Sequence, residues 1–215
     1  KNREFSQNLP DKNISVSQLV NNYALCNCAL RALWNGIYLR NVICENNIFF
    51  DENVRFGMED YLFNLKVLEY IDTVCFISNI LYIHYDRIEQ STSAKYAPQK
   101  YADIINTAKM ERLFLEKRTS IKETWIYHQY QYLSFYLGIL THPNNPININ
   151  QKKDILKKIN EPDQLGLQCS RILCFNFFFR DPKKGVISIL YNFKAYRILL
   201  LLHEKYRMMT RYVKK

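Results

Sequence analysis

Two adjacent carboxylates, Glu59 and Asp60, open a segment over residues 59–70 in which apolar residues recur at helical spacing. Gly57 precedes them and permits a tight turn or a close approach of the backbone to a ligand. The free N–H groups and the dipole at a helix N-terminus favour the ionised form of a carboxylate. An ionised carboxylate on a helix anchored in the core is a suitable general base. Helix capping is the alternative role for such a pair, and the two residues alone leave it open.

The elements that must position this pair lie on both sides of it. The helix over 59–70 carries a stripe of leucines expected to be buried. A strand over 48–50 and a turn over 51–53 are expected before the helix. An apolar strand rich in β-formers is expected over 74–85 after it.

Helices are also expected at both ends of the chain. Residues 1–14 are polar and are expected to be frayed or extended, after which Ser15 or Ser17 caps a helix that runs to about Leu33. A second helical segment is expected over 34–42. A polar loop over 86–99 comes before the helices of the second half, and His142 to Pro146 forms a break there. The later helices are predicted over 99–140 (two helices), 151–160, 166–179 and 185–212, with a turn over 180–185.

Together, these expected elements make an α+β fold that is predominantly helical, and the low content of Gly and Pro argues against a sandwich or barrel dense in turns. Hydrophobic residues make up 48% of the 215 positions, which is ample for a buried core, and only 5 Gly and 6 Pro occur. No glycine-rich phosphate loop is present. Six cysteines lie in apolar or aromatic stretches, which favours buried thiols in a reducing cytosol over metal ligation.

Four segments occur in a fixed order between residues 15 and 96. They are Trp34-Asn35-Gly36-Ile37-Tyr38-Leu39-Arg40, Ile48-Phe49-Phe50-Asp51-Glu52, Gly57-Met58-Glu59-Asp60-Tyr61-Leu62-Phe63-Asn64, and Leu81-Tyr82-Ile83-His84-Tyr85 with Ser91-Thr92-Ser93. This order resembles the second half of the GT-A core in bacterial family 2 glycosyltransferases that build capsule, exopolysaccharide or lipopolysaccharide. Gly36 stands where that family usually has lysine, and Met58 interrupts its Gly-Glu-Asp.

The resemblance implies roles for individual residues. Asp60 would deprotonate the acceptor hydroxyl in an inverting sugar transfer, and Glu59 would support it or bind the acceptor. His84 would approach the metal and the diphosphate, with a core histidine as the alternative. Arg87 would meet phosphate oxygens, with a solvated loop arginine as the alternative. The substrate-binding residues implied are Trp34, Asn35, Arg40, Gly57 and Arg87.

The resemblance also implies how the chain is divided and what it binds. Residues 1–97 would form the acceptor-side part of the GT-A core, with a remnant of its sheet edge, and residues 98–215 a helical C-terminal domain. The substrates would be a nucleotide-sugar donor and a polysaccharide or lipid-linked acceptor. The family's metal-binding Asp-x-Asp, for Mg or Mn, and its nucleotide-binding half are not among these residues. We therefore expect a fragment that by itself is inactive and binds no cofactor tightly.

The C-terminus is strongly basic. The chain carries a net charge of +10, and residues 194–215 hold seven basic residues and one acid. This tail predicts either an amphipathic helix on an anionic membrane surface or a core-packed last helix with a solvated basic face. Nucleic acid is a less favoured partner because no signature of a binding motif is present. The expected location is the cytoplasm, with peripheral attachment to the inner face of its membrane open. The alternative function is a non-catalytic helical interaction or membrane-surface module.

Overall fold

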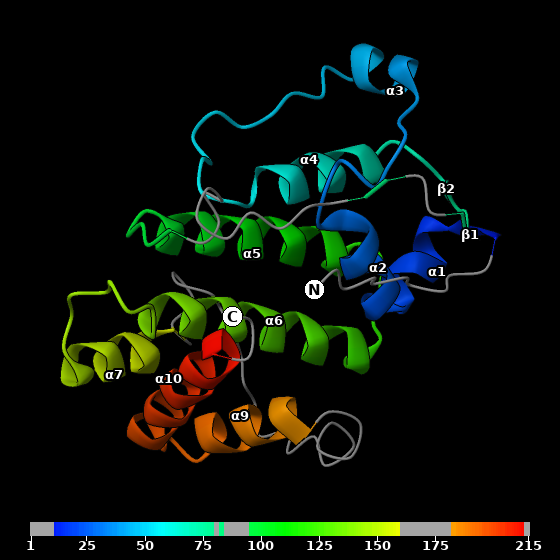
Figure 1. Cartoon of the computed structure of the whole chain (residues 1–215). Helices are drawn as coiled ribbons and strands as arrows, with labels where there is room; N and C mark the ends of the chain where they lie inside the picture. The colour runs from blue at the N-terminus through cyan, green and yellow to red at the C-terminus, as the bar shows by residue number, and fades with distance from the viewer. Residues whose placement is uncertain (1–10, 80–81, 84–94, 160–181, 213–215) are drawn as a thin grey trace. The chain divides into compact units, whose positions relative to one another are not determined.

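The chain folds into two compact units in a computed structural model that describes residues 11–79, 82–83, 95–159 and 182–212 (Figure 1). Unit 1 consists of Lys1–Lys95 and Met110–Trp125, and unit 2 of Tyr96–Lys109 and Ile126–Lys215. The described residues are mostly helical, with one small antiparallel sheet of two strands. The predicted helix-dominated α+β class is therefore confirmed. The division into an acceptor-side part of a GT-A core over 1–97 and a helical C-terminal domain over 98–215 stays a prediction.

The sheet of unit 1 joins two segments that are far apart in the sequence. β1 (Lys12–Ser15) pairs antiparallel with β2 (Thr73–Phe76), with Ile14 opposite Val74. Ile14 is buried, so the sheet contributes to the core of this unit. The strand predicted over 74–85 is wrong in length, because β2 ends at Phe76 and the described residues after it form no strand.

Two short helices follow β1 instead of the single long one predicted. Ser15 accepts a hydrogen bond from the Gln18 N–H and the Gln18 side chain accepts one from the Ser15 N–H, which forms a capping box at α1 (Val16–Asn21). Asn22 has φ −110° and ψ 80°, which is not helical, and α2 (Tyr23–Leu30) starts after it. Ser15 is thus the cap, and the prediction of one continuous helix is wrong.

The next segment differs most from the sequence-based expectation. α3 (Arg40–Glu45) begins six residues later than the helix predicted over 34–42. Residues 36–39, which the prediction included in the helix, are not helical. Residues 48–50 form no strand. Ile48 is buried and packs against α4 together with partly buried residues of the preceding segments. The apolar run over 48–50 therefore contributes a buried residue to the core beside α4 and does not form a strand.

α4 (Glu59–Leu68) matches the predicted helix to within two residues at its end. Its apolar face is almost wholly buried, as the leucine stripe predicts. The buried apolar residues of α4 are Tyr61, Leu62, Phe63, Leu65, Val67 and Leu68. Burial of so much of a ten-residue helix fixes the position of its first turn, which carries Glu59 and Asp60.

The two long helices predicted within residues 99–140 are confirmed as α5 (Lys100–Glu116) and α6 (Lys122–Leu140). The boundary between the two units passes through both helices. Within unit 1, the Thr119 hydroxyl donates to Asn21 Oδ1 at 2.7 Å, and the Thr124 hydroxyl donates to the Val20 carbonyl at 3.2 Å. The loop between the long helices and the first turn of α6 are therefore both bonded to α1.

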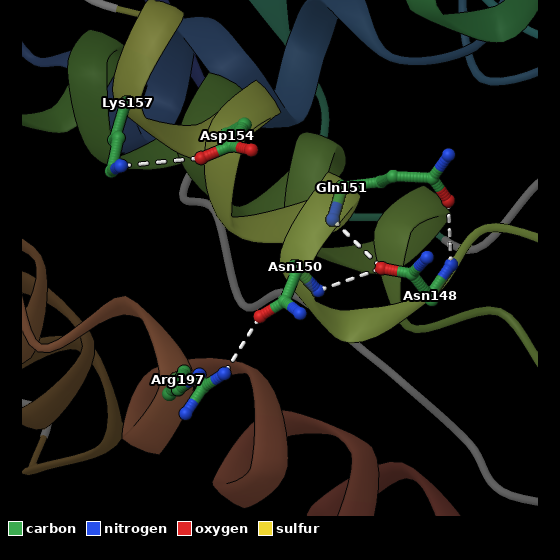
Figure 2. A network of polar contacts seen from close by, with 6 residues as sticks. All are labelled: Asn148, Asn150, Gln151, Asp154, Lys157 and Arg197. Carbon is green, nitrogen blue, oxygen red and sulfur yellow. Dashed lines mark hydrogen bonds and ion pairs between the residues drawn. The ribbon is translucent and has the colours of Figure 1, made fainter.

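Unit 2 is helical in its described part. α7 (Ile149–Lys158) has a capping box formed by Asn148 and Gln151 (Figure 2). α9 (Pro182–Asn192) and α10 (Tyr196–Tyr212) follow, and α10 contacts both α7 and α9 (Figure 1).

The prediction of a single helix over 185–212 is wrong. Lys194 adopts a left-handed conformation with φ 58°, and the chain turns there before α10 begins. The turn predicted over 180–185 is also wrong, because α9 begins at Pro182. The helix predicted over 166–179 lies outside the described residues.

His203 of α10 is held inside unit 2. The Thr141 hydroxyl donates to the Leu137 carbonyl at 2.7 Å and also lies 2.9 Å from His203 Nδ1, within hydrogen-bond distance. Burial, followed by the charges of Lys183 and Arg207, lowers the pKa of His203 to about 4. The neutral form of His203 is therefore favoured at physiological pH.

The cysteines differ in exposure. Cys26 is buried, as predicted, but Cys44 and Cys75 are exposed, so the expectation of uniformly buried thiols is wrong. Cys169 and Cys174 lie outside the described residues. In the described part of the chain, no helix is both long and apolar enough to cross a membrane.

Candidate functional site

Asp60 lies in the first turn of α4 and is partly buried. Its Oδ2 accepts a long hydrogen bond, 3.4 Å, from the Leu33 N–H, although the two residues are 27 positions apart in the sequence. This bond brings the turn at Trp34 and Asn35 next to the carboxylate. The structure therefore places Asp60 beside the segment that contains Trp34 and Asn35.

The pKa of Asp60 is raised from its usual value. Burial is the largest cause and the charge of Glu59 adds to it, while the hydrogen bond from Leu33 opposes both. The sequence-based expectation was that the helix N-terminus would favour the ionised form, and it is wrong about the net direction. Desolvation by the neighbouring segment outweighs the hydrogen bond to the carboxylate.

Glu59 does not contact Asp60 by a hydrogen bond but secures the loop before it. The Gly57 N–H donates to Glu59 Oε2 at 2.9 Å. Gly57 has φ +108°, a conformation that residues with a side chain rarely adopt. Met58 stands at the N-cap and makes no side-chain cap bond. Gly57 and Glu59 therefore stabilise the turn immediately before Asp60, which lies in the first turn of α4.

A tyrosine and an asparagine complete the surroundings of Asp60. The Tyr38 hydroxyl donates to Asn64 Oδ1 at 2.6 Å, and Asn64 Nδ2 donates to the Leu30 carbonyl at 2.9 Å. Burial raises the pKa of Tyr38; the Asn64 bond opposes this and the charge of Asp60 adds to it. Tyr38 is therefore coupled to Asn64 of α4 by a hydrogen bond and to Asp60 by charge.

Exposed aromatic rings lie beside this group. The Trp34 ring is 48% exposed and stacks on Tyr82, with ring centroids 5.0 Å apart and planes 27° from parallel. Asn35 is exposed in the same turn. Arg40 is exposed at the first position of α3, and no contact within the described part of the chain joins it to Asp60. The stacked pair presents a flat apolar face to solvent.

Two of the predicted site residues, His84 and Arg87, lie outside the described residues. Among those that are described, no three His, Cys, Asp or Glu side chains gather as a metal site would require.

The sequence did not predict a buried polar cluster that packs against α4. Glu111 Oε1 accepts hydrogen bonds from the Tyr23 hydroxyl at 2.7 Å and from the Tyr61 hydroxyl at 2.5 Å. Burial, and then the Glu111 charge, raises the pKa of Tyr23 and of Cys26 above their usual range. The cluster joins α2, α4 and the end of α5 within unit 1, and no local sequence signal marks Glu111.

Chemically, the arrangement around Asp60 offers one partly desolvated carboxylate next to polar groups and an exposed aromatic pair. A carboxylate with a raised pKa is a better proton acceptor than an ordinary surface aspartate, because its basicity is closer to neutral pH. Comparisons with protein-family models, with curated proteins and with solved structures return no match to this chain.

Proposed function

We propose that these residues form the acceptor side of an inverting glycosyltransferase, with Asp60 as the catalytic base. The observation that carries this proposal is the contact of Asp60 Oδ2 with the Leu33 N–H, which places the Trp34 turn beside the carboxylate. These are the residues that the resemblance to family 2 glycosyltransferases assigns to base and acceptor. The ordered motifs and this contact therefore support the same assignment.

The chemistry is a single displacement. Asp60 accepts the proton of an acceptor hydroxyl as the acceptor oxygen forms a bond to the anomeric carbon of the donor sugar. The bond from that carbon to the nucleoside diphosphate breaks, and the diphosphate leaves with the electron pair. The anomeric configuration is inverted, and the proton passes from Asp60 to solvent after the product departs.

The other residues of the site bind and position. The stacked Trp34 and Tyr82 rings give a sugar ring of the acceptor an apolar surface on which to lie. Glu59 and Gly57 hold the loop that leads to Asp60. Arg40 is assigned to the cleft for acceptor and nucleotide on the resemblance alone. The reaction belongs in the cytoplasm, at the inner face of the membrane if the acceptor is lipid-linked.

The test is the stereochemistry of transfer by the natural gene product that carries these 215 residues. The enzyme is incubated with a panel of uridine and guanosine diphosphate hexoses and a polyprenol-linked sugar acceptor, and the anomeric configuration of the product is read by NMR. We expect inversion relative to the donor. Retention of configuration, or donor hydrolysis with no transfer across the panel, would refute a single displacement on this site.

A further inference from the structure

α10 carries a stripe of exposed apolar side chains in unit 2. These side chains follow helical spacing with one interruption, at Lys205, and are between 48% and 59% exposed. The residues of this α10 stripe are Ile198, Leu201, Leu202, Met208 and Met209. The spacing places all five on one face of the helix, with the exposed Lys205 between them.

The opposite face of α10 packs in the core of unit 2, where Tyr196, Leu199 and Leu200 are buried. The helix is also bonded to α7, because Arg197 Nη2 donates to Asn150 Oδ1 at 2.7 Å (Figure 2). Packing on one side and this bond at the start of the helix fix its rotation about its axis. This packing therefore sets which face of α10 is exposed among the described residues of the unit.

Positive charge accompanies the apolar stripe. Lys194, Arg197 and Lys205 are exposed, and residues 194–215 carry seven basic residues against the single acid Glu204. An anionic surface complements this charge. A second copy of the chain does not, because pairing two α10 stripes would bring like charges together around Lys205.

We propose that the α10 stripe docks on an anionic lipid surface, with the helix lying in the plane of the surface. The five apolar side chains enter the boundary between headgroups and acyl chains. Lys205 extends its apolar stem along the same face and places its ammonium group among the headgroup phosphates. The exposed Lys194 and Arg197 contact anionic headgroups, each strengthening binding about fivefold at modest salt.

The test uses co-sedimentation of the 215-residue chain with vesicles. The vesicles contain phosphatidylcholine alone or mixed with phosphatidylglycerol, at low and at high salt. We expect the chain to sediment with the mixed vesicles and to be largely released by high salt. Equal binding to both kinds of vesicle, or none to either, would overturn the proposal.

Matched variants locate the binding surface. The double variant Leu201→Ser/Met208→Ser should weaken the partition coefficient about tenfold or more, because two apolar side chains no longer enter the lipid. Leu113→Ser is the control, since Leu113 on α5 is 58% exposed, as Leu201 is, but lies outside the stripe. Lys205→Gln should weaken binding about fivefold to the mixed vesicles only. Equal losses for the Leu113 variant and the double variant would contradict the assignment.

Two further measurements establish that the double variant stays folded and that the wild-type chain does not pair with itself. Far-UV circular dichroism should show unchanged helicity in the double variant, because both side chains are exposed. Light scattering without vesicles should give a monomer for the wild type. A dimer that the double variant abolishes would identify the α10 stripe as an interface between two copies and would overturn lipid docking.

Discussion

Replacing Glu111 with alanine should strongly destabilise unit 1. The Glu111 carboxylate is 1% exposed and accepts hydrogen bonds from the hydroxyls of Tyr23 and Tyr61, which are 3% and 5% exposed. Glu111→Ala leaves both hydroxyls buried without this acceptor, at a cost of about 1–3 kcal/mol each. The free energy of unfolding should therefore fall by about 2–6 kcal/mol.

Tryptophan fluorescence isolates this effect. The only two tryptophans of the chain, Trp34 and Trp125, both belong to unit 1, so urea melts followed by fluorescence report on that unit. Glu116→Ala is the matched control, because its exposed ion pair with Arg112 at 2.8 Å contributes at most about 1 kcal/mol.

Glu111→Gln keeps an acceptor oxygen and should lose less than the alanine variant. This second variant keeps the comparison informative if Glu111→Ala does not fold. A loss for Glu111→Ala of less than about 1 kcal/mol, or one equal to that of Glu116→Ala, would refute the structural role of the cluster.

Two other predictions concern the first helix and the pH dependence of unit 2. Ser15→Ala should lower the stability of unit 1 by about 1 kcal/mol because it removes the capping box, whereas Ser17→Ala, at an exposed position within α1, should change it by less than about 0.5 kcal/mol in the same melts. Burial and the charges of Lys183 and Arg207 lower the pKa of His203 to about 4, below the value of about 6.5 in the unfolded chain. The unfolded state thus binds the proton more tightly, so this contribution is complete above pH 6.5 and is lost as pH falls from 6.5 to 4. With allowance for partial solvent screening, His203 should account for about 1–2 kcal/mol between pH 7 and pH 5, measured as the difference between wild type and His203→Gln in urea melts followed by circular dichroism; an identical pH dependence in the two proteins would contradict it.

The sequence predicts those elements whose signals are local. The apolar spacing of residues 59–70 and the two acids at its start predict α4 to within two residues at its end. Ser15 with Gln18 three positions later matches the capping-box pattern that the structure contains. Such signals lie within one or two helical turns of the sequence, so they do not depend on contacts with distant parts of the chain.

The errors arise where distant contacts decide the outcome. The helix breaks at Asn22 and Lys194 occur at residues that are neither glycine nor proline, so no local breaker predicts them. Three apolar residues at 48–50 fit a strand as well as a core contact, and packing of Ile48 against α4 selects the second. The raised pKa of Asp60 depends on burial beside the Leu33 segment, 27 residues away. Periodicity carries no information about that burial.

The central claim is that the Asp60 carboxylate takes the proton of the acceptor, and the rate of sugar transfer by Asp60→Asn tests it most directly. The amide preserves the size of the side chain but cannot accept that proton, so turnover at saturating donor and acceptor should fall by about 10²–10⁴-fold. Glu69→Gln, which neutralises an exposed carboxylate at the other end of α4, should retain wild-type turnover. Wild-type turnover by Asp60→Asn would contradict the account.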